Sequence, residues 1–566
     1  MSVSRRQFLT TSVAALTSAG LGARSEGMAF ISRALPTARR TSRVTVASCL
    51  PESPAAEQFR ALALVAVDAA RQGGADYADI RIGVLREIYP PSVQIALGYG
   101  VRARVRDAWS FQHGTILTTD AVAAAARSAT LGAHVAAETN ARFRSMVAGS
   151  AHTTAIDVVD SISDSISAPV VRGVWESPVA IDPFSVTVDD YQRLTASLGL
   201  MLDRLGFVSG NGGVYWGVET RVFAATNGSL VTQTTTRGGL TLSVSATLPH
   251  NMLDTVDFTV PGFGWTSAGF EAALRSDIAT RMAEIAEETI RWRALPFRRF
   301  SDVGRYPVVF DGNVMANVIG HTVSLALDSD RAVGNEIEAS GRSFLTPIAE
   351  VVTASKPAFS PLLTMTSGRE TPSATAVRWD DEGVTPETFS LVDKGHVVDY
   401  YTTRETAPVL ADWYRRRGTP LRSRGCLVAP TPGSIPMASG GDVRVAPGEQ
   451  GTTIGALTRD MSHGFLLLGG AEVIASPGLT GGYMRPNITV EIQRGLPVAR
   501  LSNVWLAFST KALFEKGLVA LGDGSTMRTA DVDTYKGMPW ETFRHPLTAP
   551  AALCKEIDVM QTDVHG

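Results

Sequence analysis

Cysteine is scarce in this chain of 566 residues, which contains Cys49, Cys426 and Cys554 and no others. The three lie far apart and form no Cys-x-x-Cys pair, so the sequence excludes a disulfide framework and a cysteine-rich zinc cluster. An excess of charge of one sign is also missing, because the net charge is -3. Without a basic excess, the composition gives no electrostatic footprint for nucleic acid.

Long apolar runs and several catalytic motifs are absent as well. No stretch is long and apolar enough for a permanent membrane span. The sequence contains neither a Gly-x-Ser-x-Gly motif nor a P-loop. Ser462 and His463 are neighbours, but adjacent side chains on a strand point to opposite faces, which argues against a Ser-His relay there. A serine hydrolase or a nucleotide hydrolase is therefore not indicated.

The N-terminus carries Arg5 and Arg6 within the sequence Ser-Arg-Arg-Gln-Phe-Leu. A weakly apolar run, TTSVAALTSAGLGA, follows and ends in small residues near Ala23. This run is too short and too weakly apolar to span a membrane as a permanent helix. The pattern predicts a twin-arginine export signal, and hence a periplasmic or otherwise exported protein. The alternative is a basic tail with no targeting role.

A chain of this length is expected to form two or three domains. Its composition, 44% hydrophobic and 19% charged, is ordinary for a globular protein with a real core. Changes in pattern along the sequence predict five segments. These are an export signal (1–30), a linker (31–52), an N-terminal α/β domain (53–165), a middle domain (166–300) and a C-terminal metalloprotease-like domain (301–566).

Periodicity predicts the fold class. Apolar residues at helical spacing predict a helix over 55–72, and alternating residues predict strands between Tyr77 and His113. Asn227-Gly228 predicts a hairpin turn, and glycine pairs such as Gly469-Gly470 separate many short strands in the second half. The acidic run Asp380–Glu382 suits metal binding or, more simply, a turn between strands. The predicted fold is α+β, with mixed N-terminal α/β domains followed by a mainly antiparallel β C-terminal domain.

The most informative stretch runs from Tyr306 to Leu345. It begins as a buried strand over Tyr306–Phe310, and Asp311 can cap the helix that follows. That helix is predicted over 312–327, and it carries His321 among apolar residues, so it should be buried against the second half of the chain.

This stretch and the segment that ends it, Gly341-Arg342-Ser343-Phe344-Leu345, resemble the core of the TldD/PmbA family, often called modulators of DNA gyrase. The segments Tyr77–Gly83 and Asp380–Ala407 also resemble family sequences, so the resemblance extends over nearly the whole chain after the signal. Active members of this family are zinc metalloproteases. The resemblance implies that their helix carries a His-Glu-x-x-x-His motif and that a cysteine near the C-terminus is the third zinc ligand.

The metal motif of this chain departs from that pattern. His321 matches the second histidine, but Ala316 and Asn317 stand in the places of the first histidine and the glutamate. Thr534 stands at the place matching the cysteine, shortly before Lys536. A catalytic zinc needs three protein ligands and a nearby base. His321 is therefore expected to be a vestigial ligand, and the chain is expected to be inactive and without a cofactor by itself.

The resemblance also implies a partner. Active TldD-like chains pair with a related chain that lacks the metal motif, and the heterodimer encloses a chamber in which unfolded peptides are cut. We interpret this chain as such a non-catalytic subunit, paired with a TldD-like catalytic chain or with itself. Zinc would then belong to the partner chain, and Cys554, which lies too far along the sequence to match the ligand, would be a buried structural thiol.

An active zinc metallopeptidase with a rearranged site is the alternative. His321 could combine with Asp328, Asp330, Glu336 or Glu338. A helical aspartate seven residues after His321 would lie on the same face of the helix. A capping or solvent-facing carboxylate is the commoner explanation for such residues, and their spacing matches no known zinc arrangement.

Overall fold

A computed structural model of the chain describes residues 54–89, 92–147, 170–204, 209–247, 253–258, 265–274, 291–292, 294–502 and 504–561. The predicted export signal, with Arg5 and Arg6, and the predicted linker with Cys49 lie outside these residues. No helix in the described ranges combines the length and the apolar character needed to cross a bilayer.

The N-terminal part is a mixed sheet in the order β3-β2-β1-β5-β6-β4, with β7 also paired to β6. All neighbours are antiparallel except β4, which runs parallel to β6. The strands are β1 (Tyr77–Tyr89), β2 (Ser92–Val105), β3 (Ala108–Gly114), β4 (Arg172–Glu176), β5 (Ser209–Ala225), β6 (Leu230–Thr247) and β7 (Leu253–Phe258).

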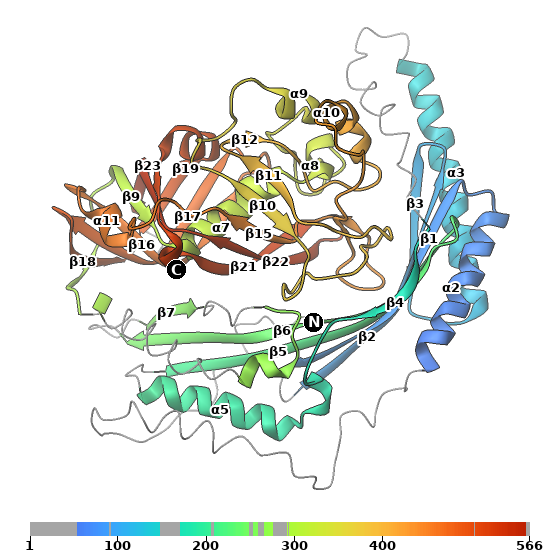
Figure 1. Cartoon of the computed structure of the whole chain (residues 1–566), viewed down its shortest axis with the longest axis horizontal. Coiled ribbons are helices and arrows are strands. Elements are labelled where there is room, and N and C mark those ends of the chain that lie inside the picture. The colour runs from blue at the N-terminus through green and yellow to red at the C-terminus, as the bar shows by residue number, and fades with distance from the viewer. Residues whose placement is uncertain are drawn as a thin grey trace. The chain divides into compact units, whose positions relative to one another are not determined.

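Helices cover this sheet (Figure 1). The helix α2 (Pro54–Gln72) packs on β1 and β5, α3 (Thr119–Val147) packs on β2 and β3, and α5 (Val188–Arg204) packs on β5. The predicted helix over 55–72 is confirmed as α2. The predicted hairpin is confirmed too, because Gly228 turns between β5 and β6 with a φ of 93°, which glycine adopts without strain.

A six-stranded sheet in the order β12-β11-β10-β15-β22-β21 forms one half of the C-terminal part. Its neighbours are antiparallel except for β15 and β22. The strands are β10 (Met365–Gly368), β11 (Phe389–Asp393), β12 (His396–Val397), β15 (Asp442–Val445), β21 (Arg528–Lys536) and β22 (Glu541–Ala549), and a separate pair is formed by β13 (Leu427–Val428) and β14 (Met437–Ala438).

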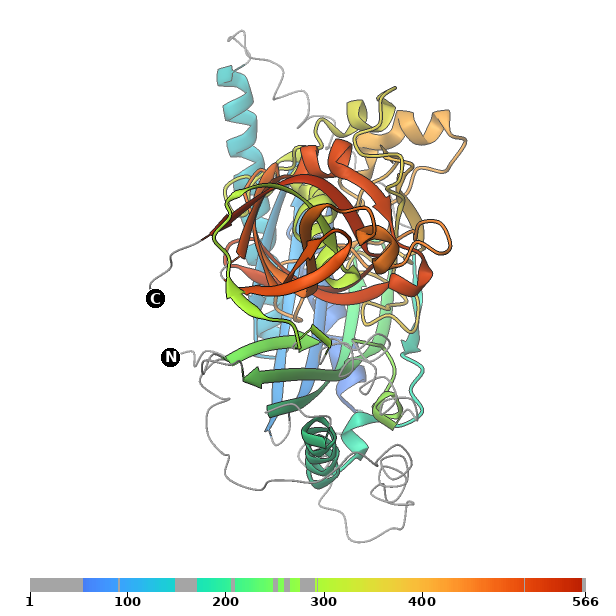
Figure 2. The same ribbon diagram turned by 90° about the vertical axis from the view of Figure 1, so that its left-hand side faces the viewer.

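The other half is an eight-stranded sheet in which five strands close into a small barrel. The ring β16-β9-β23-β19-β17 closes because β17 pairs with both β19 and β16, and Figure 2 shows its strands curving around one another. The strands are β8 (Phe297–Arg299), β9 (Gly304–Phe310), β16 (His463–Ala475), β17 (Gly481–Gln493), β18 (Leu496–Ser502), β19 (Val504–Ser509), β20 (Leu518–Leu521) and β23 (Ala552–Gln561).

The helix α7 (Gly312–Ile319) lies between these two sheets and packs on β16, β21 and β22 (Figure 1). Its approach to β21 is close, because a Cβ on Gly320 would lie 2.7 Å from Val532 Cγ1. The shorter helices are η3 (Pro183–Ser185), η4 (Phe270–Leu274), η5 (Gly320–Ser324), α8 (Ser329–Val333), α9 (Ile348–Thr353), η6 (Ala407–Leu410), α10 (Ala411–Arg416), α11 (Ile454–Thr458), η7 (Ala512–Gly517) and η8 (Gly524–Thr526). The predicted α+β class, with a mainly antiparallel C-terminal part, is confirmed.

Candidate functional site

Asp311 begins the helix that carries the motif residues. Its carboxylate accepts hydrogen bonds from the backbone N–H of Val314 (2.7 Å) and from that of Gly469 (2.7 Å). The first bond satisfies a free amide of the first helical turn, as an N-cap does. The second ties the start of α7 to β16. One buried side chain thus fixes both where the helix begins and how it sits on the barrel.

The predicted helix over 312–327 is present but is not uniform. At Gly320, α7 passes into the π-helical turn η5, and helical structure continues to Ala326. A π-helical turn inside an α-helix carries one extra residue, and such turns are frequent at functional sites. His321 lies in this turn, so its side-chain direction differs from that in a regular α-helix.

The imidazole of His321 is held by backbone groups. Its Nδ1 lies 2.9 Å from the carbonyl oxygen of Asn317, and the ring also interacts with the backbone of Asp533 on β21. Burial lowers the pKa of His321, and the two backbone contacts offset only part of that effect. The ring is therefore neutral near pH 7, and its contacts are those of a structural side chain.

The two residues in the places of the first histidine and the glutamate also have structural roles. Ala316 is fully buried in the core of the C-terminal part. The side-chain oxygen of Asn317 accepts a hydrogen bond from the backbone N–H of Ala471 (3.0 Å), where the register of β16 shifts between Leu468 and Ala471. Asn317 thus supports a bulge of the barrel, a role that the sequence did not indicate.

Near the C-terminus, Thr534 lies buried on β21, and its hydroxyl donates to the carbonyl of Phe543 (3.3 Å). Cys554 is fully buried on β23, opposite Val308 of β9. Burial raises the pKa of the Cys554 thiol, so it is protonated at neutral pH. Both residues pack in the interior of the C-terminal part.

The residues at the motif positions do not fit a catalytic zinc ion. The positions supply one imidazole, from His321, together with a methyl group, a carboxamide engaged by the backbone, and a hydroxyl that donates to a carbonyl. Zinc requires three nitrogen, sulfur or carboxylate ligands and an open position. No step of a reaction can therefore be assigned to zinc bound at these positions of this chain.

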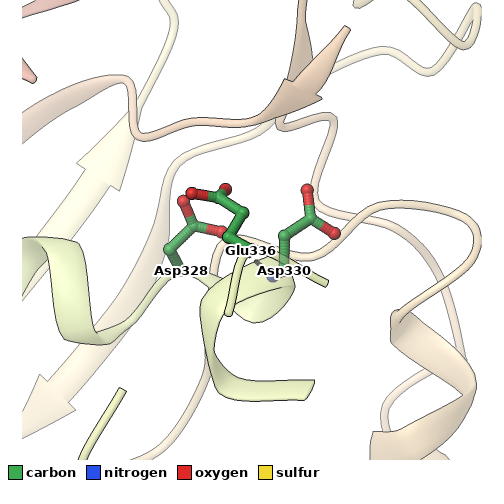
Figure 3. A group of neighbouring side chains, drawn as sticks. All are labelled: Asp328, Asp330 and Glu336. Atoms are coloured by element: carbon green, nitrogen blue, oxygen red, sulfur yellow. Dashed lines mark hydrogen bonds between the residues drawn. The ribbon is translucent and has the colours of Figure 1, made fainter. Parts of the chain in front are cut away.

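A group of carboxylates lies just after this helix (Figure 3). One oxygen each of Asp328, Asp330 and Glu336 lies within 4.8 Å of the others. Within the described ranges, this is the single group of three or more metal-binding side chains that meets that distance, and His321 is not part of it. Asp328 and Glu336 are buried, whereas Asp330 is half-buried.

A lysine from β21 is already bound to two members of this group. The ammonium of Lys536 is fully buried, contacts Asp328 and the carbonyl of Ala438, and lies 2.8 Å from Glu336 Oε1. The backbone N–H of Ala438 donates in turn to Asp330 (2.8 Å). Lys536 therefore stands where a cation among these carboxylates would otherwise be needed.

The protonation of the group follows from burial and from mutual repulsion. Burial raises the pKa of Asp328 to about 7, and the carboxylates of Glu336 and Asp330 act in the same direction against Lys536. For Lys536, burial lowers the pKa, but Asp328 and Glu336 raise it by more, so the pKa lies above its usual value. The ammonium stays charged at neutral pH and cannot act as a base.

His321 does not lie in the close group that Asp328, Asp330 and Glu336 form. Asp328 has an extended backbone, caps α8 and forms a bridge with Tyr401. The preferred interpretation of this residue as a capping carboxylate is therefore confirmed, and the alternative, a helix face shared with His321, is wrong. Of the four carboxylates considered with His321, Glu338 is exposed and the other three meet around Lys536.

A cavity of about 640 Å³ opens next to the carboxylates. Its walls come from the α8 loop, from the segment around Glu405, from β14 and its approach, from the turn after β21, and from Arg102 of the N-terminal sheet. Asp330 and Glu336 line it, so the carboxylate group is open to this cavity on one side.

The acidic run Asp380–Glu382 acts as a turn that joins parts of the chain. Asp381 binds the guanidinium of Arg221 on β5 (2.5 Å) and the backbone N–H of Ala429 (2.7 Å). Burial and the nearby Glu382 raise the pKa of Asp380 to about 8. Arg81, fully buried on β1, has its Nε 3.9 Å from Asp381. The interpretation as a turn is confirmed, but the arginines that meet it were missed because they belong to distant strands.

Comparison with known proteins identifies a family domain in the C-terminal part of the chain. Residues 303–561 match the PmbA/TldA metallopeptidase C-terminal domain. No curated protein sequence matches the chain.

Three solved structures share its fold. TldE from Thermococcus kodakarensis has a TM-score of 0.60 and 15% identity, with 87% of this chain and 98% of that chain covered. Candidate modulators of DNA gyrase from Bacteroides thetaiotaomicron and Thermotoga maritima have TM-scores of 0.57 and 0.62, identities of 15% and 13%, and coverage of 89% of this chain and 99% and 100% of theirs.

Proposed function

Through residues 303–561 the chain belongs to the PmbA/TldD metallopeptidase family, and from this premise we propose that it is the non-catalytic subunit of a heterodimeric peptidase. A TldD-like partner supplies the zinc and the peptide-cutting chemistry, and this chain helps to enclose the unfolded peptide. The observation that carries the proposal is the donor set at the metal-motif positions, where His321 is the single imidazole beside Ala316, Asn317 and Thr534.

The packing of these positions supports a settled non-catalytic role. Ala316 fills the core, Asn317 binds the bulge of β16, and His321 is bonded to the backbone of its own helix. Loss of a single ligand would leave the remaining donors pointing at a shared empty position. Here each side chain has a packing or hydrogen-bonding partner of its own, which favours a subunit that shapes a chamber.

Metal content tests the proposal. The mature chain is purified alone and together with a TldD-like protein encoded beside it, and zinc and mass are measured in both preparations. We expect no stoichiometric zinc in the chain alone and one zinc per heterodimer in the complex, with peptidase activity only in the complex. One zinc held by the chain alone would contradict the proposal and favour a rearranged site. A stable homodimer without a partner would replace the heterodimer.

We also propose that the chain is exported through the twin-arginine pathway. The support is the sequence pattern around Arg5 and Arg6. Replacing both with lysine should retain the protein in the cytoplasm, as measured by cell fractionation and immunoblotting. The matched control replaces Arg39 and Arg40 with lysine, which leaves the signal intact and should not change the distribution. Equal export of both variants would refute the assignment.

A further inference from the structure

We propose that the cavity beside the α8 loop binds a lysine or arginine side chain of an extended peptide, with aliphatic residues of that peptide resting on its rim. This inference rests on the proposed function for the source of the peptide. It adds a preference for basic residues, which the family assignment does not contain. Four observations carry it: the size of the cavity, its exposed apolar rim, its unpaired carboxylates, and a lysine that already occupies the adjoining carboxylate group.

The volume of the cavity and the segments that form its walls suit a long peptide side chain together with the residues next to it in the peptide. Its volume is about 640 Å³, within the range of about 300–1,000 Å³ that is common for ligand sites. The walls come from segments far apart in the sequence, including the loop from Gly334 to Ala339, Glu405, and the turn at Gly537-Met538. A long side chain can therefore enter while the main chain stays at the mouth.

The rim of the cavity exposes large apolar side chains. Ile337 is 57% exposed, Met538 77% and Ile435 40%, and all three line the cavity. Trp540, 67% exposed, continues the patch along the turn between β21 and β22, where its ring lies 6.1 Å from that of Tyr535. Exposed apolar side chains that gather around one opening are typical of an interaction site.

Inside the rim, the lining is acidic and short of counter-ions. Glu338 and Glu405 line the cavity, and neither has an ion-pair partner among the residues that the structure describes. Asp330 also lines it, but belongs to the carboxylate group beside Lys536 and accepts a hydrogen bond from the backbone N–H of Ala438. Arg102 also lines it, but its guanidinium is bound to Asp79 (2.5 Å). Burial raises the pKa of Glu405 to about 7; Asp330 and Glu382 act in the same direction, and Arg102 and Arg104 oppose them in part. A cation that enters the cavity would relieve this repulsion.

The same groups disfavour a bare metal ion. The carboxylates close enough to share an ion are Asp328, Asp330 and Glu336, and the ammonium of Lys536 is already bound to two of them. The remaining unpaired groups, Glu338 and Glu405, are not part of that close group. An ammonium or guanidinium on a flexible stem can reach separated carboxylates, and its methylene groups can pack on Ile337 and Ile435.

Binding of matched peptides to the purified mature chain tests the inference directly. Three labelled peptides differ at one position in an otherwise identical aliphatic sequence: lysine, norleucine or glutamate. Fluorescence anisotropy at physiological ionic strength should show the lysine peptide binding roughly 10-fold or more tightly than the norleucine peptide, because a charge-assisted contact is added. The glutamate peptide should bind most weakly.

Variants assign the selectivity to the cavity. Glu338→Gln, at an exposed position, should reduce the preference for lysine over norleucine by roughly 3-fold, and Glu338→Gln combined with Glu405→Gln should remove most of it. Met538→Ser should weaken both peptides equally. Glu449→Gln makes the same charge change at an exposed residue outside the cavity and should leave the preference intact. Thermal unfolding of each variant confirms that it is folded.

Three results would overturn the inference: equal affinities for the lysine and norleucine peptides, an equal loss of preference in Glu449→Gln, or displacement of the lysine peptide by Mn²⁺ alone. The measurement needs neither a partner nor catalysis. The outcome is therefore independent of the proposed function. A chain that holds its own zinc could still prefer the lysine peptide, and a non-catalytic subunit could bind the lysine and norleucine peptides equally.

Discussion

Two neighbouring regions of the C-terminal part face β21 and differ in their chemistry. The first, α7 with η5, contains Ala316, Asn317 and His321 and carries no acidic, lysine or arginine side chain. The second, from Asp328 to Glu336, holds three carboxylates around Lys536. The positions on α7 and η5 where the family resemblance would place zinc ligands carry no carboxylate, whereas the segment that follows them carries three.

The two regions also differ in the interactions that hold their side chains in place. In the first region Ala316, Asn317 and His321 each have a packing or hydrogen-bonding contact. The side-chain oxygen of Asn313 and both ring nitrogens of His545 on the adjoining strand β22 are buried without a hydrogen-bond partner among the described residues. In the second region Lys536, Asp328 and Glu336 are buried and paired with one another. Removal of one of these charges leaves a buried partner without its counter-ion. Substitutions in the first region should act through packing, whereas loss of a charge in the second should act through its buried ion partners. Lys536→Met and His321→Ala test this contrast.

The largest effect is expected for Lys536→Met. It leaves Asp328 and Glu336 buried without their cation, and breaking a buried pair in this way costs about 3–5 kcal/mol in the free energy of unfolding. The loss should be smaller at pH 5 than at pH 8, because protonated carboxylates no longer need the ammonium. Denaturant unfolding, followed by fluorescence at both pH values, measures it.

The control for Lys536→Met removes the charges of both partners. Adding Asp328→Asn and Glu336→Gln to Lys536→Met should restore much of the lost stability, because neutral amides are far less costly to bury than unpaired charges. If Lys536→Met were as stable as the wild-type chain, the ion group would be open to water and the contrast between the two regions would disappear.

His321→Ala should have a smaller effect on stability and no effect on metal content. It removes a half-buried ring and the contact with the carbonyl of Asn317, for which about 1–2 kcal/mol is a typical loss. Zinc content, measured on the chain alone and in complex with its partner, should be unchanged. His396→Ala, which removes another half-buried imidazole on β12, is the matched control for metal analysis. A zinc deficit confined to His321→Ala would show that His321 is a ligand.

Sequence reasoning predicted the first region better than the second. Asp311 as a cap, the strand before it and the buried helix all follow from local patterns, because a cap and a helix face are set by residues close in sequence. The switch to a π-helical turn at Gly320 was not predicted, since it depends on packing against Val532 of a distant strand. The domain boundaries and the roles of the motif residues stay predictions.

The second region shows why the rest could not be foreseen. Nothing in the sequence around Lys536 indicates that its ammonium meets carboxylates of a distant segment, such as Asp328, which lies 208 residues earlier in the chain. The capping role of Asp328 follows from its place after an apolar helix, but its bridge with Tyr401 joins segments far apart in the sequence. Buried ion groups join residues of distant strands, so periodicity cannot reveal them. Their one signal here is the clustering of acidic residues after an apolar helix.

The smallest effect is a change in the pH dependence of stability in Glu405→Gln. Burial raises the pKa of Glu405 from about 4.5 to about 7 in the folded protein. Between these values the folded state binds more protons than the unfolded state, so this residue lowers the stability as pH rises through the interval. Glu405→Gln removes that loss, and we expect a gain on the order of 1–2 kcal/mol at pH 8 with little change at pH 4.

Thermal unfolding of Glu405→Gln from pH 4 to pH 8 measures this change, and Glu449→Gln, at an exposed site, is the matched control and should follow the wild-type curve. A Glu405→Gln curve parallel to the wild-type curve would mean that Glu405 is solvated and that the acidic cavity carries no electrostatic strain. The lysine peptide provides a link between this prediction and the cavity. If the peptide is bound, its ammonium compensates the charge of Glu405 in the wild-type chain, and the difference in stability between the wild-type chain and Glu405→Gln at pH 8 should disappear.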